Sequence, residues 1–278
     1  MKIGIVGLGL IGGSLAKAYI RNTDYTIYGT DNDTLAVKLA MLTETMDAEL
    51  TDELLPSCDF IFLAIYPRAA VTWLEENAAK LSSHTVVIDC CGIKQTVCET
   101  GFKLAKQYGF QYCGGHPMAG TQFTGFKYSK EDMFQDASMI LVPPVDPDIN
   151  LLERIHKILA KAGFTHVTIT TAEKHDNMIA YTSQLAHIVS NAYVKSPNAQ
   201  IHHGFSAGSY RDLTRVARLN ENMWTELFLD NAESLTGEID FLINSLQQYS
   251  DAIKSGDADR LRALLREGRL LKENEEQL

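Results

Sequence analysis

Short apolar runs alternate with longer amphipathic segments along residues 1–170 of the chain. The runs are rich in Val, Ile, Leu and Phe and carry few charges, which is typical of strands buried on both faces of a parallel sheet. They cover residues 2–6, 25–30, 59–65, 85–89, 110–113, 138–142 and 164–170. The segments between them predict helices at 15–20, 33–42, 68–81 and 149–162, and another that ends near 108. This alternation predicts an α/β fold with a doubly wound, mainly parallel sheet.

The pattern changes near residue 170, beyond which long helical stripes replace the alternation of strands and helices. Thr170 and Glu173 have the spacing of a capping box, which marks the start of a helix. We therefore expect two domains, an α/β domain at 1–170 followed by an all-α domain at 171–278.

A glycine pattern, Gly7-x-Gly9-x-x-Gly12, links the first strand to the first helix. Strand, turn and helix in this order form the dinucleotide-binding fingerprint of Rossmann-type domains. Unpaired N–H groups at the helix start would bind the pyrophosphate there, so Leu10 and Ile11 join the three glycines as predicted cofactor contacts. A glycine-rich turn without any ligand is the alternative.

The second predicted strand ends at Asp31, about twenty residues after Gly12. A carboxylate at this place accepts a hydrogen bond from a ribose hydroxyl and repels a 2′-phosphate, so we expect NAD rather than NADP. The alternative is that Asp31 only caps the next helix. Ile65 ends a later strand at the edge where doubly wound sheets bind ligands, and is a further candidate for a cofactor contact.

Two stripes of residues, spaced by three and four positions, lie along the first predicted helix of the second domain. The predicted core-facing stripe is Met178, Tyr181, Leu185, Val189 and Ala192. The other stripe is polar and consists of Asn177, Gln184, His187 and Asn191. A polar stripe is most often solvent-exposed, but one without Lys or Glu is unusual in water. A ligand-lining role and a solvated face are therefore both open.

Two further patterns suggest chemistry. His116 is bracketed by glycines at 114–121, which favours an imidazole placed for a purpose. Arg211 and Arg215 are one helical turn apart, so a helix would align their guanidinium groups for capture of a carboxylate. Ion pairs on the protein surface, with Asp212 for example, are the ordinary interpretation of such arginines.

A long apolar stripe between residues 222 and 250 predicts one extended helix, which is interrupted at Gly256. The stripe consists of Trp224, Leu227, Phe228, Asn231, Leu235, Ile239, Leu242 and Leu246. Because little else in the chain could cover it, we expect a homodimer that forms through the C-terminal helices.

Composition excludes several classes of function. The net charge of −10, without a run of Lys or Arg, argues against a nucleic-acid partner. No apolar stretch is long enough to span a membrane and the chain starts directly with a strand, so we expect no membrane association and a cytoplasmic protein. The five cysteines lack the spacing of a zinc site or a disulfide framework, so no metal is predicted.

Three motifs together resemble the prephenate and arogenate dehydrogenases of tyrosine biosynthesis. They are the glycine pattern, Gly115-His116-Pro117-x-Ala119-Gly120-Thr121, and Arg211-Asp212-Leu213-Thr214-Arg215-Val216-Ala217. The resemblance covers nearly the whole chain. It implies NAD-dependent oxidative decarboxylation of prephenate to 4-hydroxyphenylpyruvate, with a helical half that forms the dimer.

The resemblance also implies roles for single residues. His116 would be the catalytic base that accepts the proton of the substrate's 4-hydroxyl, and Arg215 would bind a substrate carboxylate. His187 and Gln184 match positions that line the family's substrate pocket. Thr121 and Arg211 are further candidates for substrate contacts.

The chain departs from the family pattern at two places. Gly92, within Cys91-Gly92-Ile93-Lys94, stands where the family usually has a serine, so the hydroxyl that helps to orient the histidine is missing. A water or Thr121 would have to replace it. Gln122 stands where a Glu is common, which slightly favours prephenate over arogenate because the ammonium group of arogenate would attract an acid.

Three other functions compete with this prediction. The first is the same reaction on arogenate. The second is a β-hydroxyacid or imino-acid reductase, which would need a catalytic lysine in the long helix, where Lys174 comes too early to be convincing. The third is a regulatory protein that senses NAD without chemistry, for which the chain lacks a basic patch or an additional domain.

Overall fold

The computed structural model describes residues 1–121, 123–202 and 204–276. Contacts divide the chain into two compact units, Met1–Asn231 and Ala232–Leu278. The first contains the sheet and helices α1 to α9, and the second contains α10 and α11. The boundary at residue 170 stays a prediction.

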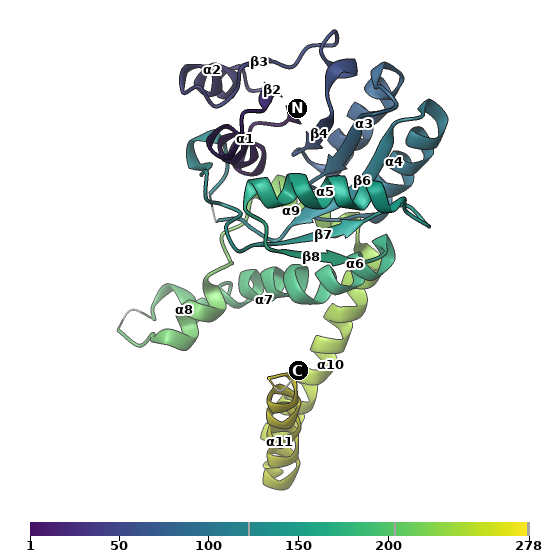
Figure 1. The fold of residues 1–278 in the computed structure, drawn as a ribbon. Coiled ribbons are helices and arrows are strands. Elements are labelled where there is room, and N and C mark those ends of the chain that lie inside the picture. The colour runs from purple at the N-terminus through teal and green to yellow at the C-terminus, as the bar shows by residue number, and fades with distance from the viewer. Residues whose placement is uncertain (122, 203, 277–278) are drawn as a thin grey trace. The chain divides into compact units, whose positions relative to one another are not determined.

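In the part of the chain that the structure describes, eight strands form one sheet in the order β3-β2-β1-β4-β5-β6-β7-β8 (Figure 1). They span Lys2–Val6, Thr26–Thr30, Ala48–Glu49, Phe60–Leu63, Val86–Asp89, Gln111–Pro117, Ser138–Val142 and His166–Ile169 for β1 to β8. Every neighbouring pair is parallel except β6 and β7. The doubly wound, mainly parallel sheet is therefore confirmed, and β3 is a short edge strand that the apolar pattern did not predict.

The helices of the α/β part cover both faces of the sheet (Figure 1). They span Leu10–Asn22, Thr34–Leu42, Pro67–Asn77, Gln95–Tyr108 and Ile149–Ala162 for α1 to α5. Alternate residues of one strand enter different cores, since Phe60 and Phe62 pack with α1 and α5 whereas Ile61 and Leu63 pack with α3 and α4. Burial on both faces explains why the strands read as continuous apolar runs.

The helix after β8 is interrupted. It consists of α6 (Ala172–Ile179), a π-helical turn (Ala180–Leu185) and α7 (Ala186–Tyr193). The predicted core-facing stripe is wrong for its first members, because Met178 and Tyr181 are 52% and 59% exposed. The buried face instead carries His175, Asp176, Ile179, Ala180, Gln184 and Leu185. An extra residue in the π turn shifts the register, so spacings of three and four do not describe a single face.

The predicted single helix from 222 to 250 is also wrong. Helix α8 (Gly208–Thr214) is followed by α9 (Glu221–Leu229), and a new helix, α10 (Ala232–Ser255), begins after Asp230 and Asn231. The buried side chain of Asn231 donates to the backbone oxygen of Asp176 at 2.9 Å and to Gln184 Oε1 at 2.7 Å. A polar residue of the predicted apolar stripe thus anchors the chain to α6 at the break.

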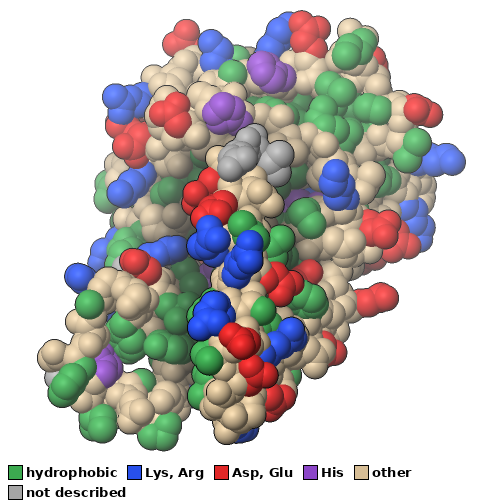
Figure 2. Space-filling model, turned by 90° about the horizontal axis from the view of Figure 1, so that it is seen from below, with side chains coloured by type: hydrophobic (Ala, Val, Ile, Leu, Met, Phe, Trp, Pro, Cys, Tyr) green, Lys and Arg blue, Asp and Glu red, His purple; other side chains and the backbone are tan. Residues whose placement is uncertain are grey.

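The second unit is a pair of helices, α10 and α11 (Ala258–Glu275), joined at Gly256. Tyr249 donates a hydrogen bond from its hydroxyl to the backbone oxygen of Leu264. Phe241, Ile243, Leu246 and Ile253 leave a large apolar surface of α10 exposed. On the face drawn in Figure 2, basic and acidic side chains are interspersed rather than segregated. Among the described residues, no helix is apolar and long enough to cross a membrane.

Candidate active site

The glycine turn has the geometry that its sequence predicts. Gly7 has a φ of +90°, and a Cβ there would lie 2.5 Å from the backbone oxygen of Ala64. A Cβ on Gly12 would lie 1.8 Å from the oxygen of Gly7, so neither position accepts a side chain. Gly9 faces open space at the start of α1, where N–H groups are available to an anion.

A cavity of about 1060 Å³ opens beside this turn at the carboxyl edge of the sheet. Its lining includes Gly7, Gly9, Asp31, Ile65 and Trp73. The size and the mixed polar and apolar lining suit a nucleotide. The predicted contacts Leu10 and Ile11 are half-buried at the start of α1, outside this lining.

Asp31 does not cap the following helix. Asp33 is the residue that accepts the hydrogen bond from Leu35 N at the start of α2. The carboxylate of Asp31 accepts from Leu8 N at 2.6 Å and from Asp33 N at 2.8 Å, which holds it at the edge of the cavity. A fixed carboxylate there suits a ribose hydroxyl and disfavours a phosphate.

His116 lies near the carboxyl end of β6, at the same edge of the sheet as the cavity, because β6 is parallel to β5. Its neighbouring glycines permit close packing. A Cβ on Gly115 would lie 2.4 Å from the oxygen of Asp89, and one on Gly114 would lie 2.4 Å from Cys98 Sγ. The glycines around the histidine therefore let β6 press against β5 and α4.

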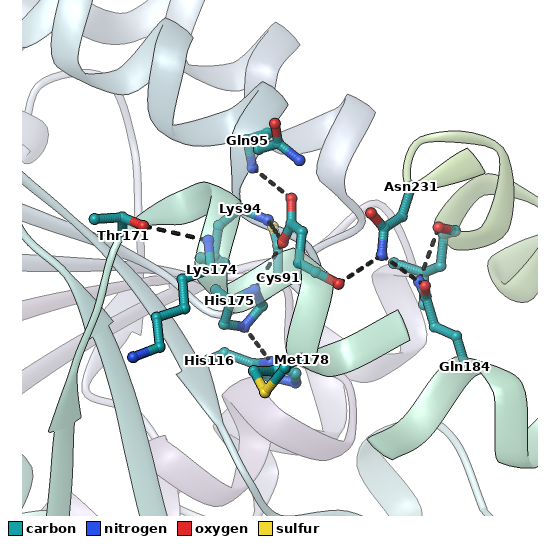
Figure 3. Close-up of polar contacts among 12 residues, drawn as sticks. Cys91, Lys94, Gln95, His116, Thr171, Lys174, His175, Met178, Gln184 and Asn231 are labelled. Atoms are coloured by element: carbon teal, nitrogen blue, oxygen red, sulfur yellow. Dashed lines mark hydrogen bonds and ion pairs between the residues drawn. The ribbon is translucent and has the colours of Figure 1, made fainter. Parts of the chain in front are cut away.

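The ring of His116 contacts a second histidine from α6. His116 Nδ1 lies 2.9 Å from His175 Nε2, and His175 Nδ1 lies 2.7 Å from Asp176 Oδ1 (Figure 3). The Asp176 carboxylate also accepts hydrogen bonds from the backbone N–H groups of Lys94 and Gln95, at 2.7 and 2.9 Å. Burial would raise the pKa of Asp176, but the bonds from His175 and from these two N–H groups outweigh burial and lower it.

A second buried carboxylate, Asp89, ends β5. It forms an ion pair with Lys94 Nζ and accepts a hydrogen bond from the Tyr112 hydroxyl at 2.6 Å. Lys94 Nζ also donates to the backbone oxygen of Gly115 at 2.6 Å, next to His116. Burial alone would lower the pKa of Lys94, but the Asp89 carboxylate outweighs burial and raises it.

These surroundings keep His116 uncharged. Burial lowers its pKa well below 6.5, and the neighbouring His175 and the cation of Lys94 lower it further. A neutral imidazole at physiological pH can accept a proton, as a general base must.

The polar residues of the π turn and α7 divide into two groups. Gln184 is almost fully buried, with Nε2 donating to the oxygen of Leu227 at 3.0 Å and Oε1 accepting from Asn231. The structure thus gives both ends of its amide protein partners, and a substrate contact for Gln184 stays a prediction. His187 is half-buried and packs against Trp224, with ring centroids 4.0 Å apart and the ring planes tilted by 32°. Its pKa is lowered by burial and by Arg215, against a hydrogen bond to Ser183.

The predicted arginines lie at the end of α8. Arg211 and Arg215 are both exposed, one turn apart. Among the described residues, neither forms an ion pair with Asp212 or any other acid, so the ordinary interpretation of these arginines as surface ion pairs receives no support. Arg215 is close enough to His187 to lower its pKa.

Thr121 does not replace the missing hydroxyl. Its Oγ1 accepts from Phe123 N at 3.2 Å, and the partner of His116 is His175 instead. Gln122 lies outside the described residues. The sequence analysis missed His175 and Asp176. The predicted capping box is also wrong by one residue, because Thr171 rather than Thr170 caps α6 and its Oγ1 accepts from Lys174 N. No group of potential metal ligands occurs within the described ranges.

Two family models match this chain. The nucleotide-binding domain of prephenate dehydrogenase matches residues 15–168, and its dimerization domain matches residues 171–267. The chain belongs to the prephenate dehydrogenase family. It is therefore a dehydrogenase, an oxidoreductase, and the family resemblance of the three motifs is confirmed.

Individual family members are similar over nearly the whole chain. The prephenate dehydrogenase of Bacillus subtilis is 29% identical over 272 residues, which are 92% of this chain and 71% of that protein. The cyclohexadienyl dehydrogenase of Zymomonas mobilis is also 29% identical, over 93% of this chain and 90% of that protein. The crystal structure of Aquifex aeolicus prephenate dehydrogenase with hydroxyphenyl propionate and NAD+ has a TM-score of 0.81 and 26% identity, covering 99% of this chain and 98% of that one.

Proposed function

We propose that this protein is an NAD-dependent prephenate dehydrogenase that converts prephenate to 4-hydroxyphenylpyruvate and carbon dioxide. One observation carries the proposal. A half-buried His116, whose pKa is lowered well below 6.5, lies at the same edge of the sheet as a cavity that contains the glycine turn and Asp31. The oxidation of an alcohol needs a base close to the nucleotide, and a shared edge of the sheet suits that requirement.

The residues of the cavity fit the cofactor. Gly9 leaves room for a pyrophosphate at the start of α1, and Asp31 presents a fixed carboxylate for a ribose hydroxyl. The related Aquifex aeolicus enzyme was crystallised with NAD+. NAD+, when bound, would accept the hydride from the ring carbon that bears the substrate's 4-hydroxyl.

The chain's own residues would do the remaining work. His116 would take the hydroxyl proton as the alcohol becomes a ketone, and aromatisation of the ring then drives the loss of carbon dioxide. Arg215 would bind a substrate carboxylate through its two-pronged guanidinium, beside His187 and with Arg211 one turn away. Thr121 stays a further candidate for this pocket.

The charges of the proposed pocket favour prephenate over arogenate as the substrate. Prephenate carries two carboxylates and no ammonium group, and the exposed cations Arg211 and Arg215 match that charge. Two relatives are named prephenate dehydrogenase, from Bacillus subtilis and Lactococcus lactis. Arogenate is the second candidate, because the Synechocystis arogenate dehydrogenase has a TM-score of 0.81 and 26% identity over 99% of both chains.

We also propose a homodimer that forms through α10 and α11. The matched family model is a dimerization domain, and the exposed side chains of Phe241, Ile243, Leu246 and Ile253 give α10 an apolar surface. Sedimentation at working concentration tests this directly, and a monomer would contradict it.

The function is tested by following NADH formation with prephenate, arogenate and a simple β-hydroxy acid in turn, each with NAD+ and with NADP+. We expect the highest kcat/KM with prephenate and NAD+. A preference for arogenate would retain the reaction and overturn the substrate. Activity on the hydroxy acid alone would overturn the reaction.

A further inference from the structure

A continuous series of hydrogen bonds connects the start of α4 to the ring of His116. The N–H groups of Lys94 and Gln95 donate to the Asp176 carboxylate, which contacts His175 Nδ1 at 2.7 Å, and His175 Nε2 contacts His116 Nδ1 at 2.9 Å (Figure 3). His175 and Asp176 are buried, so water does not compete for these bonds. Three separate segments of the chain meet in this series.

The donors and acceptors in the series determine the proton on each ring nitrogen. The ionised Asp176 can only accept, so His175 Nδ1 must carry a proton. In a neutral His175 the other nitrogen, Nε2, then carries a lone pair. His116 must therefore donate from Nδ1, since two lone pairs at 2.9 Å would repel each other. This leaves the lone pair of His116 on Nε2.

We take His175 to be neutral, with one ring nitrogen donating to Asp176 and the other accepting from His116. The cation of Lys94, on the β5 to α4 connection, bonds to the backbone next to His116 and lowers the pKa of that imidazole. Its charge is balanced by Asp89 from β5, whereas Asp176 from α6 already receives two backbone hydrogen bonds. The positive end of α4 also stabilises the Asp176 carboxylate.

We propose that His175 and Asp176 are positioning residues, which hold His116 in the Nδ1–H tautomer and present Nε2 as the atom that takes the substrate's proton. This inference rests on the proposed function, in which His116 is the base. During the reaction the substrate's O–H bond breaks and a bond from Nε2 to hydrogen forms. The Nδ1 proton stays in place, and the carboxylate of Asp176 stabilises the imidazolium through His175.

The contact with His175 orients the His116 ring in place of the hydroxyl that is missing at Gly92. Gly92 has no side chain to orient a neighbouring imidazole, and Thr121 bonds to Phe123 instead. His175 occupies the Nδ1 side of the His116 ring, so a fixed orientation does not require a hydroxyl. A ring held in one tautomer and one orientation is always in the form that can accept the substrate's proton.

The alternative is that the series only holds α6 against α4. Two substitutions of His175 separate the possibilities. His175→Phe keeps the volume of the ring but removes both nitrogens, whereas His175→Gln offers an amide oxygen that can accept from His116 Nδ1. Thr171→Ala is the control, because Thr171 Oγ1 caps α6 through Lys174 N and touches neither ring.

For each variant we would measure kcat, the KM for prephenate, NAD+ affinity and the urea midpoint. We expect His175→Phe to lower kcat about 100-fold with little change in KM or NAD+ affinity, and His175→Gln to recover most of that loss. Thr171→Ala should lower the urea midpoint and leave kcat unchanged. Wild-type kcat in His175→Phe, or equal loss in both His175 variants, would overturn the proposal.

A second measurement does not depend on turnover. Nitrogen-15 NMR of labelled histidines reports which ring nitrogen of His116 carries the proton, with His116→Asn used to assign its signals. We expect a protonated Nδ1 and a bare Nε2 near neutral pH in the wild type, and a mixture of tautomers in Asp176→Asn. A protonated Nε2 in the neutral wild type would overturn the inference. The expected tautomer in a protein that oxidises neither prephenate nor arogenate would support it while the proposed function fails.

Discussion

Asp89 and Asp176 are both fully buried carboxylates near His116, yet their partners differ. Asp89 faces the permanent cation of Lys94 and the hydroxyl of Tyr112. Asp176 faces two backbone N–H groups and a histidine. The first carboxylate thus forms an ion pair with a lysine, whereas the second is bound by backbone N–H groups and an imidazole nitrogen.

The difference indicates two separate tasks. The pair of Asp89 and Lys94 fixes backbone, because Lys94 Nζ also bonds to the oxygen of Gly115 and so locks β6 in place. Asp176 fixes a side chain, because its contact through His175 ends on the ring of His116. Removal of one partner from a buried ion pair is costly, because it leaves the other charge buried without compensation.

The largest expected effect follows the removal of the group that both carboxylates surround. His116→Asn should lower turnover of prephenate by two to four orders of magnitude, on the order of the usual contribution of a general base. Affinity for NAD+, measured by fluorescence titration, should stay unchanged because the cavity beside Gly7 is intact. His166→Asn, on exposed β8, is the control. Unchanged turnover in His116→Asn would remove His116 from the mechanism.

The next effect tests the structural task of Asp89. Lys94→Met leaves that carboxylate buried without its cation and should cost about 3–5 kcal/mol in the free energy of unfolding, measured with urea. The same substitution at Lys80, whose partner Asp52 is exposed, should cost about 1 kcal/mol or less. Similar losses in the two variants would contradict the assignment of Lys94 as a buried structural cation.

A smaller effect concerns the dependence of stability on pH. The folded pKa of His116 is lowered well below 6.5, so the unfolded chain takes up a proton there that the folded chain refuses. Stability should therefore fall as pH drops below 6.5, by up to about 1.4 kcal/mol per unit for this residue, and the contribution stops below the folded pKa. Urea midpoints between pH 7 and 5 should fall less steeply in His116→Asn. An identical slope in both proteins would mean that the imidazole is not buried in its neutral form.

The smallest effect concerns Gly92. A Cβ there would lie 3.4 Å from the nearest side-chain atom of Leu227, an ordinary contact, so Gly92→Ser should change stability by about 0.5 kcal/mol or less. Turnover should stay within about twofold of wild type, because the Nδ1 side of His116 already has a partner. Gly115→Ser is the contrast, since its Cβ would lie 2.4 Å from the oxygen of Asp89 and should disrupt the fold. A large gain in kcat for Gly92→Ser would show that His175 orients the base incompletely.

The sequence predicted the parts of the molecule that depend on local patterns. The continuous apolar runs gave the order of strands and helices, because a strand buried on both faces needs apolar residues at every position. The turn from Gly7 to Gly12 was predicted in detail, since contiguous residues form it and sterics exclude a side chain at Gly7 and Gly12. Asp31 was predicted from spacing alone, and the structure adds that Asp33 caps the next helix.

The parts that failed depend on contacts between distant residues. The stripe that begins at Met178 misjudged the buried face, because the π turn at Ala180–Leu185 shifts the register of the helix. The predicted helix from 222 to 250 ended early because Asn231 bonds to Asp176, 55 residues away. Neither the π turn nor the hydrogen bond of Asn231 produces a periodic pattern in the sequence from which it could be predicted.

The sequence by itself thus determined the sheet and the nucleotide turn, and it singled out His116 as the candidate base. Only the tertiary structure decided what surrounds that base. Lys94 and Asp176 are 82 residues apart, and His116 and His175 are 59 residues apart. Folding brings these groups together in a buried region where each lost hydrogen bond is costly, so their protonation states and orientations depend on one another. Local sequence patterns specify the course of the backbone, whereas the protonation state and orientation of His116 depend on the polar groups that folding places around it.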